Sequence, residues 1–425
     1  MLATVVVGCG NIAINNTKLM AKELEYGLFT SDDFLKVTGK RVHTIADEET
    51  DIYLRGINVG GLFITENWMS PYVSDTMRKD HKHLSEMFVS RFGKEKALDL
   101  WDYYRECYWI DEDYKICTKM GMNVIRLPFT YMTVDPEFNN VRAIEGQKYN
   151  FELLDKFIEG AGRHGLYVIL DLHGAYGSHN GQDHSGEIID NAADVDFFSN
   201  EEKMSKTLDL WDAISERYKD NPIVAAYDLL NEPGEKAGTT TTRHFKFMDR
   251  AYDIIRENND DHIIMFESCW GAKNLPNPTS YGWTNCIYQL HHYTWTNDFE
   301  AHKKSVDSKV AEINGCGYNV PFYIGEFFCQ KNPYSWEYTF RQFNENKYHY
   351  TPWTYKVALK TQYECRGTSI FTTYKENFDP EVATYEEIKE VFNSLNTFHK
   401  DARPSTLEKG IMIGTILADF LGGTF

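Results

Sequence analysis

The sequence predicts an α/β fold, a single (β/α)8 TIM barrel with an N-terminal extension and a C-terminal tail. Short apolar segments alternate along the chain with segments of helical periodicity, a pattern typical of parallel α/β architecture. Eight strand segments can be counted, which is the number that closes a barrel. Several of them end in polar residues, and parallel barrels carry their functional groups at that end.

Composition limits the classes of partner. At 425 residues the chain is long enough for one large barrel with extended loops. Its formal net charge of −19 at pH 7 argues against nucleic acid or an anionic membrane as a partner. Aromatic residues make up 15% of the chain, enough for a large core and for a binding cleft as well. No stretch is long and apolar enough to span a membrane.

The cysteines and the N-terminus bear on the compartment. The eight cysteines are scattered and form no Cys-x-x-Cys pair, so we expect reduced thiols and no zinc site. The segment 1–11 has a short apolar run but no basic residues before it. A cytoplasmic location is therefore expected, with a secreted form as the alternative if the N-terminus is processed or truncated.

The chain divides into three parts. Residues 1–50 are irregular and form a lead-in, 51–395 form the barrel, and 396–425 form a tail packed on it. The expected strands are 52–58, 121–128, 166–172, 223–232, 262–267, 286–290, 320–325 and 367–373. The expected helices are 150–163, 203–218, 244–258, 306–313 and 336–346. The polar segment 79–114 is predicted to be an inserted loop region with helical stretches. Thr384 with Glu387 has the capping-box spacing that starts a closing helix.

The fourth strand shows most clearly how a strand end presents a reactive group. It starts as a buried apolar run at Ile223 and ends in Asn231-Glu232-Pro233. Pro233 has no N–H to donate and disfavours the right-handed helical region for the residue before it, so the strand stops there. A carboxylate and an amide are then displayed together at the carboxyl end of a strand.

Other strands end in polar groups that would meet this pair in one pocket: Arg126, His173, His291, Tyr293 and Glu326. Glu232 and Glu326 follow the fourth and seventh strands. Two carboxyl groups facing each other across a cleft are what cleavage of a glycosidic bond requires. One must donate a proton to the leaving oxygen, and burial raises the pKa of such an acid. The other must attack as an anion, which donors such as Arg126 and Tyr293 would favour.

This set of residues resembles glycoside hydrolase family 5, whose members are retaining enzymes built on (β/α)8 barrels. The similarity covers roughly residues 50–395 and lies in Arg126, His173, Asn231-Glu232-Pro233, His291-x-Tyr293 and Gly325-Glu326-Phe327. It implies that Glu232 is the acid/base and Glu326 the nucleophile. It also implies that Asn231 holds the sugar 2-hydroxyl and that Arg126 and Tyr293 orient Glu326.

Within the family, the chain is most similar to the exo-β-1,3-glucanase branch. The evidence is the segment 55–61 together with Glu66, and the loop 171–186. In that branch Glu66 and the region of Asp183 and His184 would line a pocket for a terminal glucose.

Two positions depart from the family pattern. Leu62 stands where the branch usually has Trp, and the segment 367–373 lacks the Trp that the family usually places on its eighth strand as a sugar platform. Tyr374 is a candidate replacement. Trp270 and Trp295, after the fifth and sixth strands, are the favoured aromatics for outer subsites. Others that could serve are Trp68, Tyr176, Phe327 and Trp353.

The expected activity is retaining hydrolysis of a β-glucan or β-glucoside, with β-1,3 linkage favoured. No cofactor or metal is expected, because the histidines and carboxylates show no close metal-binding spacing. A β-mannosidase or an endo-β-1,4-glucanase would use the same two glutamates and stays an alternative. A carbohydrate-binding barrel with little or no turnover is a second alternative, because fold alone does not determine function.

Overall fold

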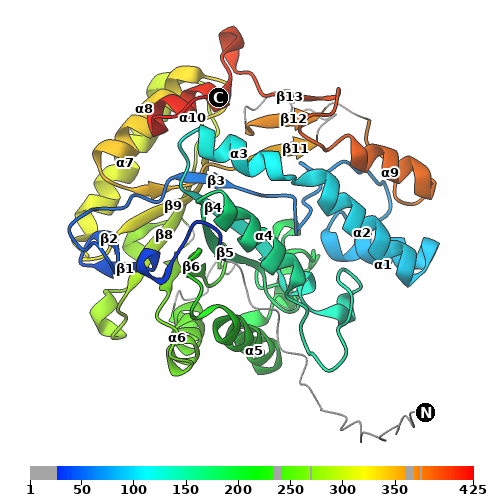
Figure 1. The fold of residues 1–425 in the computed structure, drawn as a ribbon, viewed down its shortest axis with the longest axis horizontal. Helices are drawn as coiled ribbons and strands as arrows, with labels where there is room; N and C mark the ends of the chain where they lie inside the picture. Colours follow the sequence, from blue (N-terminus) through cyan, green and yellow to red (C-terminus); the bar gives the residue numbers. More distant parts are fainter. Residues whose placement is uncertain (1–25, 234–241, 269, 359–367, 374–375) are drawn as a thin grey trace, which may run out of the picture.

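A computed structural model describes residues 26–233, 242–268, 270–358, 368–373 and 376–425. At its centre lies an eight-stranded parallel sheet surrounded by helices (Figure 1). Its strands, in spatial order, are β3 (Gly56–Asn58), β4 (Val124–Thr130), β5 (Tyr167–Gly174), β6 (Val224–Asp228), β7 (Ile263–Glu267), β8 (Cys286–Tyr293), β9 (Phe322–Phe328) and β10 (His349–Tyr350). A parallel bridge between Arg55 and Tyr350 joins the first strand to the last. The predicted (β/α)8 barrel is confirmed.

Strand β4 shows how the sequence separates the two faces of the barrel wall. Side chains alternate along a strand, so Ile125 and Leu127 point outward and pack in the core between the sheet and the helices. Val124 packs in a second core at the base of the barrel interior. Arg126 is also fully buried, and its partners come from β6 and β9 across the interior. The same alternation therefore places a charged group inside the barrel.

The helices cover the outside of the sheet. They are α1 (His81–Phe92), α2 (Lys94–Tyr108), α3 (Asp111–Lys119), α4 (Glu152–Arg163), α5 (Glu201–Tyr218), α6 (Thr242–Glu257), α7 (Phe299–Cys316), α8 (Pro333–Glu345), α9 (Tyr385–Asn393) and α10 (Ile413–Leu421). The helical stretches predicted within 79–114 are confirmed as α1 and α2, which fill most of the segment, so little of it is loop. Their apolar residues Leu84, Phe88 and Trp101 are buried.

The predicted eighth strand is wrong. The barrel closes through β10, only two residues long, which pairs with β9 through His349 and Tyr350. The segment 367–373, for which the sequence predicts the eighth strand, contains β12 (Phe371–Thr373). This strand lies in a separate sheet, between β11 (Lys356–Ala358) and β13 (Ala402–Pro404). Its apolar, β-branched residues do form a strand, but local propensity does not specify which sheet the strand joins.

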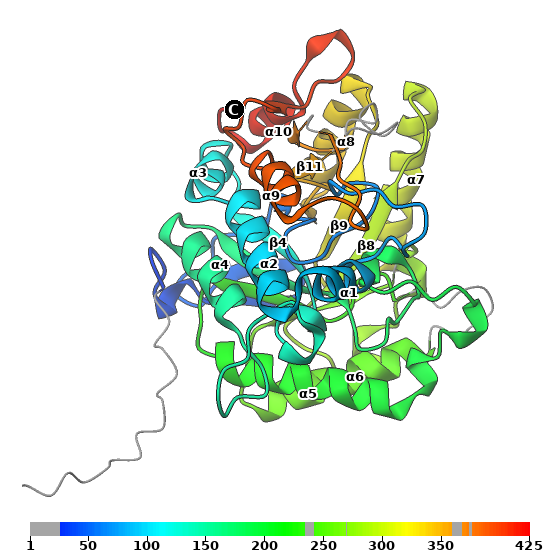
Figure 2. The same ribbon diagram turned by 90° about the vertical axis from the view of Figure 1, so that its right-hand side faces the viewer.

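Both ends of the described chain pack on the barrel. The hairpin of β1 (Leu35–Thr38) and β2 (Arg41–Thr44) places Leu35 and Val42 against the base of the barrel interior. At the other end α10 packs against α8 (Figure 2). The capping box at the start of α9 is confirmed: Glu387 accepts from the Thr384 N–H at 2.7 Å, and the Thr384 hydroxyl accepts from the Glu387 N–H at 3.3 Å. The boundaries at residues 50 and 395 stay predictions.

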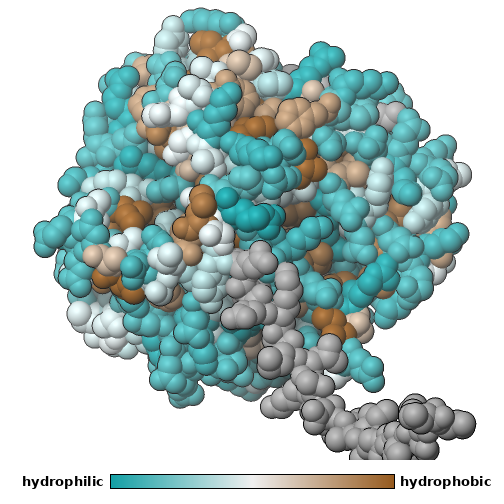
Figure 3. All heavy atoms as spheres, viewed as in Figure 1, coloured by the Kyte–Doolittle hydropathy of each residue, from teal (hydrophilic) through white to brown (hydrophobic). Residues whose placement is uncertain are grey.

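The surface is largely polar, as the net charge leads one to expect. Hydrophilic residues predominate on the face in Figure 3, and apolar residues are scattered over it. Among the described residues, no helix has both the length and the apolar character needed to cross a membrane. The five cysteines that lie in the described part of the chain are free thiols: Cys107, Cys117, Cys286, Cys316 and Cys329.

Candidate active site

A pocket of about 470 Å³ opens at the carboxyl ends of the barrel strands. Its lining contains most of the predicted site residues: Glu66, His173, Asp183, His184, Asn231, Glu232, Trp270, Tyr293, Trp295 and Glu326. Arg126 and His291 lie directly behind this lining, fully or almost fully buried. Tyr374 lies outside the described residues. The structure thus brings together twelve strand-end and loop side chains that the sequence places up to 260 residues apart (66 to 326).

Glu326 is held from two sides. Arg126 Nη1 donates to its Oε1 at 2.9 Å, and the Tyr293 hydroxyl donates to its Oε2 at 2.5 Å. Both donors come from barrel strands, β4 and β8, so their positions are fixed by the sheet. Charge-assisted hydrogen bonds of this kind stabilise a carboxylate and orient it. The carboxyl group of Glu326 is therefore held in a fixed orientation at the pocket.

Arg126 organises the floor of the pocket. Besides Glu326, it donates to Asp228 Oδ2 at 2.9 Å and to Asn231 Oδ1 at 2.9 Å. Asp171 lies 3.1 Å away and also pairs with His173, at 2.6 Å. Because Arg126 occupies the amide oxygen of Asn231, the amide nitrogen of Asn231 is the group left to bind a hydroxyl of a ligand.

Glu232 has an unusual backbone. Its φ is +42°, in the left-handed region that costs a non-glycine residue about 1–2 kcal/mol. Two hydrogen bonds hold it there: its N–H donates to Glu267 Oε2 at 2.9 Å, and its carbonyl accepts from Asn180 at 3.3 Å. Pro233 next to it already disfavours the right-handed helical region. This conformation turns the Glu232 carboxyl into the pocket.

The protonation of Glu232 differs from the expectation. Burial alone would raise its pKa, but the hydrogen bond from His291 and the charge of His184 outweigh burial and lower the pKa to about 2. Burial likewise opposes a charge on His291, yet Glu267, Glu326 and Glu232 together raise the pKa of His291 to about 9. His291 Nδ1 lies 2.8 Å from Glu232 Oε1. In the absence of a ligand, the proton is thus held mainly by His291, in direct contact with the carboxyl that would deliver it.

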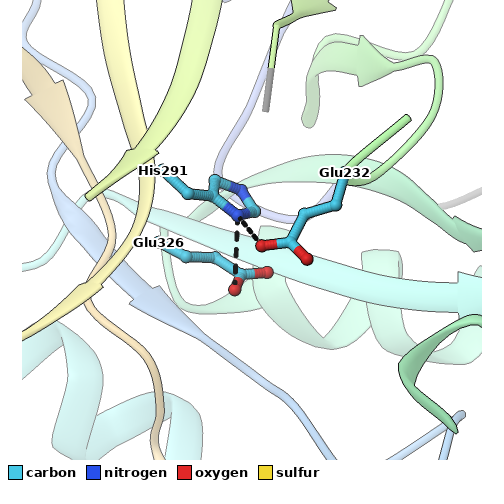
Figure 4. Close-up of side chains that lie close together, drawn as sticks. All are labelled: Glu232, His291 and Glu326. Atoms are coloured by element: carbon cyan, nitrogen blue, oxygen red, sulfur yellow. Dashed lines mark hydrogen bonds and ion pairs between the residues drawn. The ribbon is translucent and has the colours of Figure 1, made fainter. Parts of the chain in front are cut away.

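The two glutamates are close together. Glu232, His291 and Glu326 each place one side-chain atom within 4.8 Å of the others, as Figure 4 shows. Retaining glycosidases have their two carboxyl groups about 5–5.5 Å apart, whereas inverting enzymes need about 6.5–9.5 Å. The spacing fits retention. It would also suit three ligands of a metal ion, so independence from metals stays a prediction, which activity in the presence of a chelator would check.

One side of the pocket is polar, and we call Glu66, Trp68, Asp183 and His184 the polar wall. They follow β3 and β5. Glu66 is 6% exposed, and its Oε2 accepts from Trp68 Nε1 at 2.6 Å. Its Oε1 has no hydrogen-bond partner in the described part of the chain. Burial, followed by the charge of Asp183, raises the pKa of Glu66 well above its usual value. A buried polar atom without a protein partner is expected to form its hydrogen bond with a polar group of a ligand.

The opposite side is aromatic, and we call Trp270 and Trp295, which follow β7 and β8, the aromatic wall. Trp270 is 51% exposed and Trp295 is 67% exposed. Trp295 lies almost parallel to Tyr293, with ring centroids 5.9 Å apart, and its edge packs on Phe328. Large exposed aromatic faces at a pocket mouth are suited to stacking on a ligand.

The pocket has an aromatic platform that the sequence analysis did not assign. Trp353 follows the true eighth strand, β10, and lines the pocket. It is 3% exposed and stacks on His173, with centroids 5.5 Å apart and planes 12° apart. The inference that the eighth strand lacks a Trp was therefore wrong, because it rested on the wrong strand. Of the other aromatics named, Trp68 also lines the pocket, whereas Tyr176 and Phe327 belong to the core.

Glu267 is a second group that sequence reasoning missed. It ends β7, is fully buried, and contacts both Glu232 and His291. The available signal was its position at the end of a predicted barrel strand, which it shares with candidates such as His173 and Tyr293.

Comparison with known proteins finds a matching family model and several related glycosidases. The family model described as cellulase (glycosyl hydrolase family 5) matches residues 90–358, more than half of the chain. A β-xylosidase of Phanerodontia chrysosporium is 28% identical over 264 residues, covering 61% of this chain and 52% of the relative. A probable glucan 1,3-β-glucosidase A of Aspergillus terreus is 29% identical over 286 residues, covering 64% of this chain and 63% of the relative. The chain thus spans between half and two thirds of the length of these relatives.

Solved structures agree on the fold. The rutinosidase from Aspergillus niger has a TM-score of 0.58 at 16% identity, over 80% of this chain and 98% of that structure. At such low identity the likeness extends to the fold alone. Together with the match over residues 90–358, the strand-end residues and the paired glutamates establish that the chain belongs to glycosyl hydrolase family 5.

Proposed function

We propose that this protein hydrolyses a β-glycosidic bond with retention of configuration, with Glu326 as the nucleophile and Glu232 as the acid/base. The observation that carries the proposal is the geometry of the pair: one carboxyl atom of each lies within 4.8 Å of the other. That spacing supports the arrangement of retaining enzymes, in which the carboxylate itself attacks, over the wider one in which a water molecule lies between the carboxylate and the sugar.

The reaction follows from the contacts. Glu326 attacks the anomeric carbon while Arg126 and Tyr293 hold its two oxygens. As the glycosidic C–O bond breaks, Glu232 passes a proton to the leaving oxygen. A water molecule then attacks the glycosyl-enzyme, gives its proton to Glu232, and releases the sugar from Glu326. Asn231, whose oxygen is bound by Arg126, offers its N–H group to a hydroxyl of the bound sugar.

The favoured substrate is a β-glucan or β-glucoside cut from its end, with β-1,3 linkage. Two features support this. The polar wall combines the buried carboxyl group of Glu66 with the half-buried Asp183 and His184, a set suited to the hydroxyls of a single terminal sugar. Several relatives are named probable glucan 1,3-β-glucosidases. Another relative is named a β-xylosidase, which makes a β-xyloside the second candidate. A β-mannosidase or an endo-β-1,4-glucanase would use the same two glutamates and stays an alternative for the test below.

Product analysis tests the substrate. The purified protein is incubated with laminari-, cello-, manno- and xylo-oligosaccharides and with the matching aryl β-glycosides, and the products are separated with time. We expect glucose to be released singly from laminari-oligosaccharides. Oligosaccharide products would indicate endo action, and turnover only of another sugar would retain the mechanism but replace the substrate. Binding without turnover across the panel would instead favour a carbohydrate-binding barrel.

Azide rescue tests the roles of the two glutamates. Glu232→Ala should retain the first step on substrates with good leaving groups, because these need no proton. Azide fits the space left by the side chain and should attack the glycosyl-enzyme to give a β-glycosyl azide. An α-glycosyl azide would mean that no covalent glycosyl-enzyme forms.

A cytoplasmic location and the absence of nucleic-acid and membrane partners remain proposals. The net charge of −19 supports the absence of nucleic acid and anionic membranes as partners. Cell fractionation would test the location.

A further inference from the structure

A buried carboxyl group lies behind the acid/base, where no substrate can reach it. Glu267 ends β7, and its side chain is fully buried. It does not line the pocket. The reaction described above gives it no role, yet it contacts the main chain of Glu232 and the ring of His291.

The two oxygens of Glu267 do different things. Oε2 accepts from the Glu232 N–H at 2.9 Å and from Gln289 Nε2 at 3.1 Å. Oε1 lies 3.6 Å from His291 Nε2 and makes no hydrogen bond within the described part of the chain. One oxygen thus supports the strained backbone that carries the acid/base, and the other is directed at the imidazole.

His291 connects Glu267 to the reacting groups. Its Nε2 faces Glu267, while its Nδ1 lies 2.8 Å from Glu232 Oε1 and 3.5 Å from Glu326 Oε2. The ring is held in place from behind. A Cβ atom at Gly325 would lie 3.1 Å from His291 Nε2 and 2.7 Å from Gln289 Nε2, so only glycine leaves this packing undisturbed. The imidazole therefore lies between Glu267 on its Nε2 side and Glu232 and Glu326 on its Nδ1 side.

The surrounding charges come from several strands. His291 is faced by Glu267 from β7, by Glu326 from β9 and by Glu232 beyond β6. Glu267 is faced in addition by Asp228 from β6 and, at longer range, by Arg126 from β4. Burial raises the pKa of Glu267 well above its usual value, against the pull of His291, and the carboxylates raise the pKa of His291 to about 9 despite its burial. The two groups face each other, so together they retain a proton at a pH where an exposed histidine would have lost it.

We propose that Glu267 is a positioning residue: together with His291 it holds the proton that Glu232 delivers to the leaving oxygen, and through Oε2 it fixes the backbone of Glu232. The inference rests on the proposed function. In the first step the proton moves from His291 Nδ1 to Glu232 and from Glu232 to the glycosidic oxygen, as the C–O bond breaks and the anomeric carbon bonds to Glu326. In the second step the proton lost by water returns to Glu232 and then to His291.

The proposal predicts the direction in which the pH dependence of the rate should shift when Glu267 is replaced. The Glu232–His291 pair is competent while it holds its proton, and this state is lost as the pH rises through the pKa of His291, about 9. Removing the ionisable group at position 267 removes the largest charge that favours the proton on His291. The proton is then lost at lower pH, and the basic limb of the plot of kcat/KM against pH moves to lower pH.

The test compares Glu267→Gln with Glu267→Asp. Gln has the same shape and retains an acceptor for the Glu232 N–H, but it cannot ionise. Asp ionises but is shorter. The measured quantity is kcat/KM against pH for two aryl β-glycosides of the sugar that the wild type cleaves, one with a poor leaving group and one with a good leaving group.

For the poor leaving group, we expect Glu267→Gln to move the basic limb down by about one pH unit and to lower the rate about tenfold above neutral pH. The good leaving group needs little acid assistance, so its profile should stay close to that of the wild type. Glu267→Asp should retain the wild-type limb at a reduced rate. An unshifted limb in Glu267→Gln, or an equal loss for both substrates in both variants, would overturn the proposal and leave a purely structural role.

Failure of the proposed function gives a different result. In that case the wild type itself would cleave none of the glycosides. Thermal unfolding shows whether Glu267→Gln folds. If it does not, Glu267→Asp tests the proposal, and a basic limb of kcat/KM shifted away from that of the wild type would contradict it.

Discussion

The two walls of the pocket differ in both burial and chemistry. The polar wall follows β3 and β5, and Glu66 within it is 6% exposed with one oxygen unpartnered in the described chain. The aromatic wall follows β7 and β8, and its tryptophans are 51% and 67% exposed. In the strand order of the barrel these pairs of strands lie on opposite sides of the mouth. Between the walls lie the two glutamates.

The difference indicates how binding is divided. Buried acceptors lose water on folding and recover the lost hydrogen bonds only with a ligand whose hydroxyls fit them, so the polar wall can be selective. Exposed aromatic faces attract many flat surfaces without a strict geometry, so the aromatic wall tolerates variety. We infer that the polar wall selects the sugar that is released and that the aromatic wall holds whatever is attached to it. Three substitutions test this division.

The largest effect is expected between the walls. Glu326→Gln removes the nucleophile and should lower kcat/KM by at least about 10⁴-fold on every substrate, whatever its leaving group. The fold should persist, because Arg126 retains Asp171 and Asp228 as partners. Steady-state kinetics and thermal unfolding measure the two quantities. The exposed Glu300→Gln is the matched control, and loss of activity on only some substrates would contradict the assigned role.

The barrel and the glutamate pair of its pocket could be predicted from the sequence because each depends on a local pattern. The apolar run that leads to Glu232-Pro233 indicates the position of this carboxyl group without any tertiary information, although β6 itself ends earlier, at Asp228. The capping box at Thr384 is equally local. The parallel sheet then brings these ends to one edge.

The remaining features depend on contacts that no local pattern shows. The strand β10 has two residues, too few for any periodicity, so the platform Trp353 was not recognised. Glu267 stands at a strand end like the other candidates, but its function depends on contacts with Glu232 and His291. The protonation of Glu232 depends on a histidine 59 residues away in the chain.

An intermediate effect is expected in the polar wall. Glu66→Gln retains an acceptor for Trp68 Nε1 but replaces the unpartnered oxygen by an amide NH2 group, which cannot accept a hydrogen bond from a sugar hydroxyl. A buried polar group left without its partner costs about 1–3 kcal/mol, so kcat/KM should fall by about 5–150-fold. The loss should be the same for an aryl monoglycoside and for an oligosaccharide, because both place the same sugar against this wall. A loss confined to oligosaccharides would place Glu66 on the side of the leaving group.

The smallest effect is expected in the aromatic wall. Trp295→Ala removes a stacking face of about 1 kcal/mol, so KM for an oligosaccharide should rise about fivefold with little change in kcat. An aryl monoglycoside, whose leaving group is too short to cover this wall fully, should be affected less. Phe398→Ala is the matched control, since Phe398 is equally exposed at 67% and does not line the pocket. If Trp295→Ala weakened both substrates equally, the aromatic wall would contribute to binding of the released sugar, and the division between the two walls would have to be abandoned.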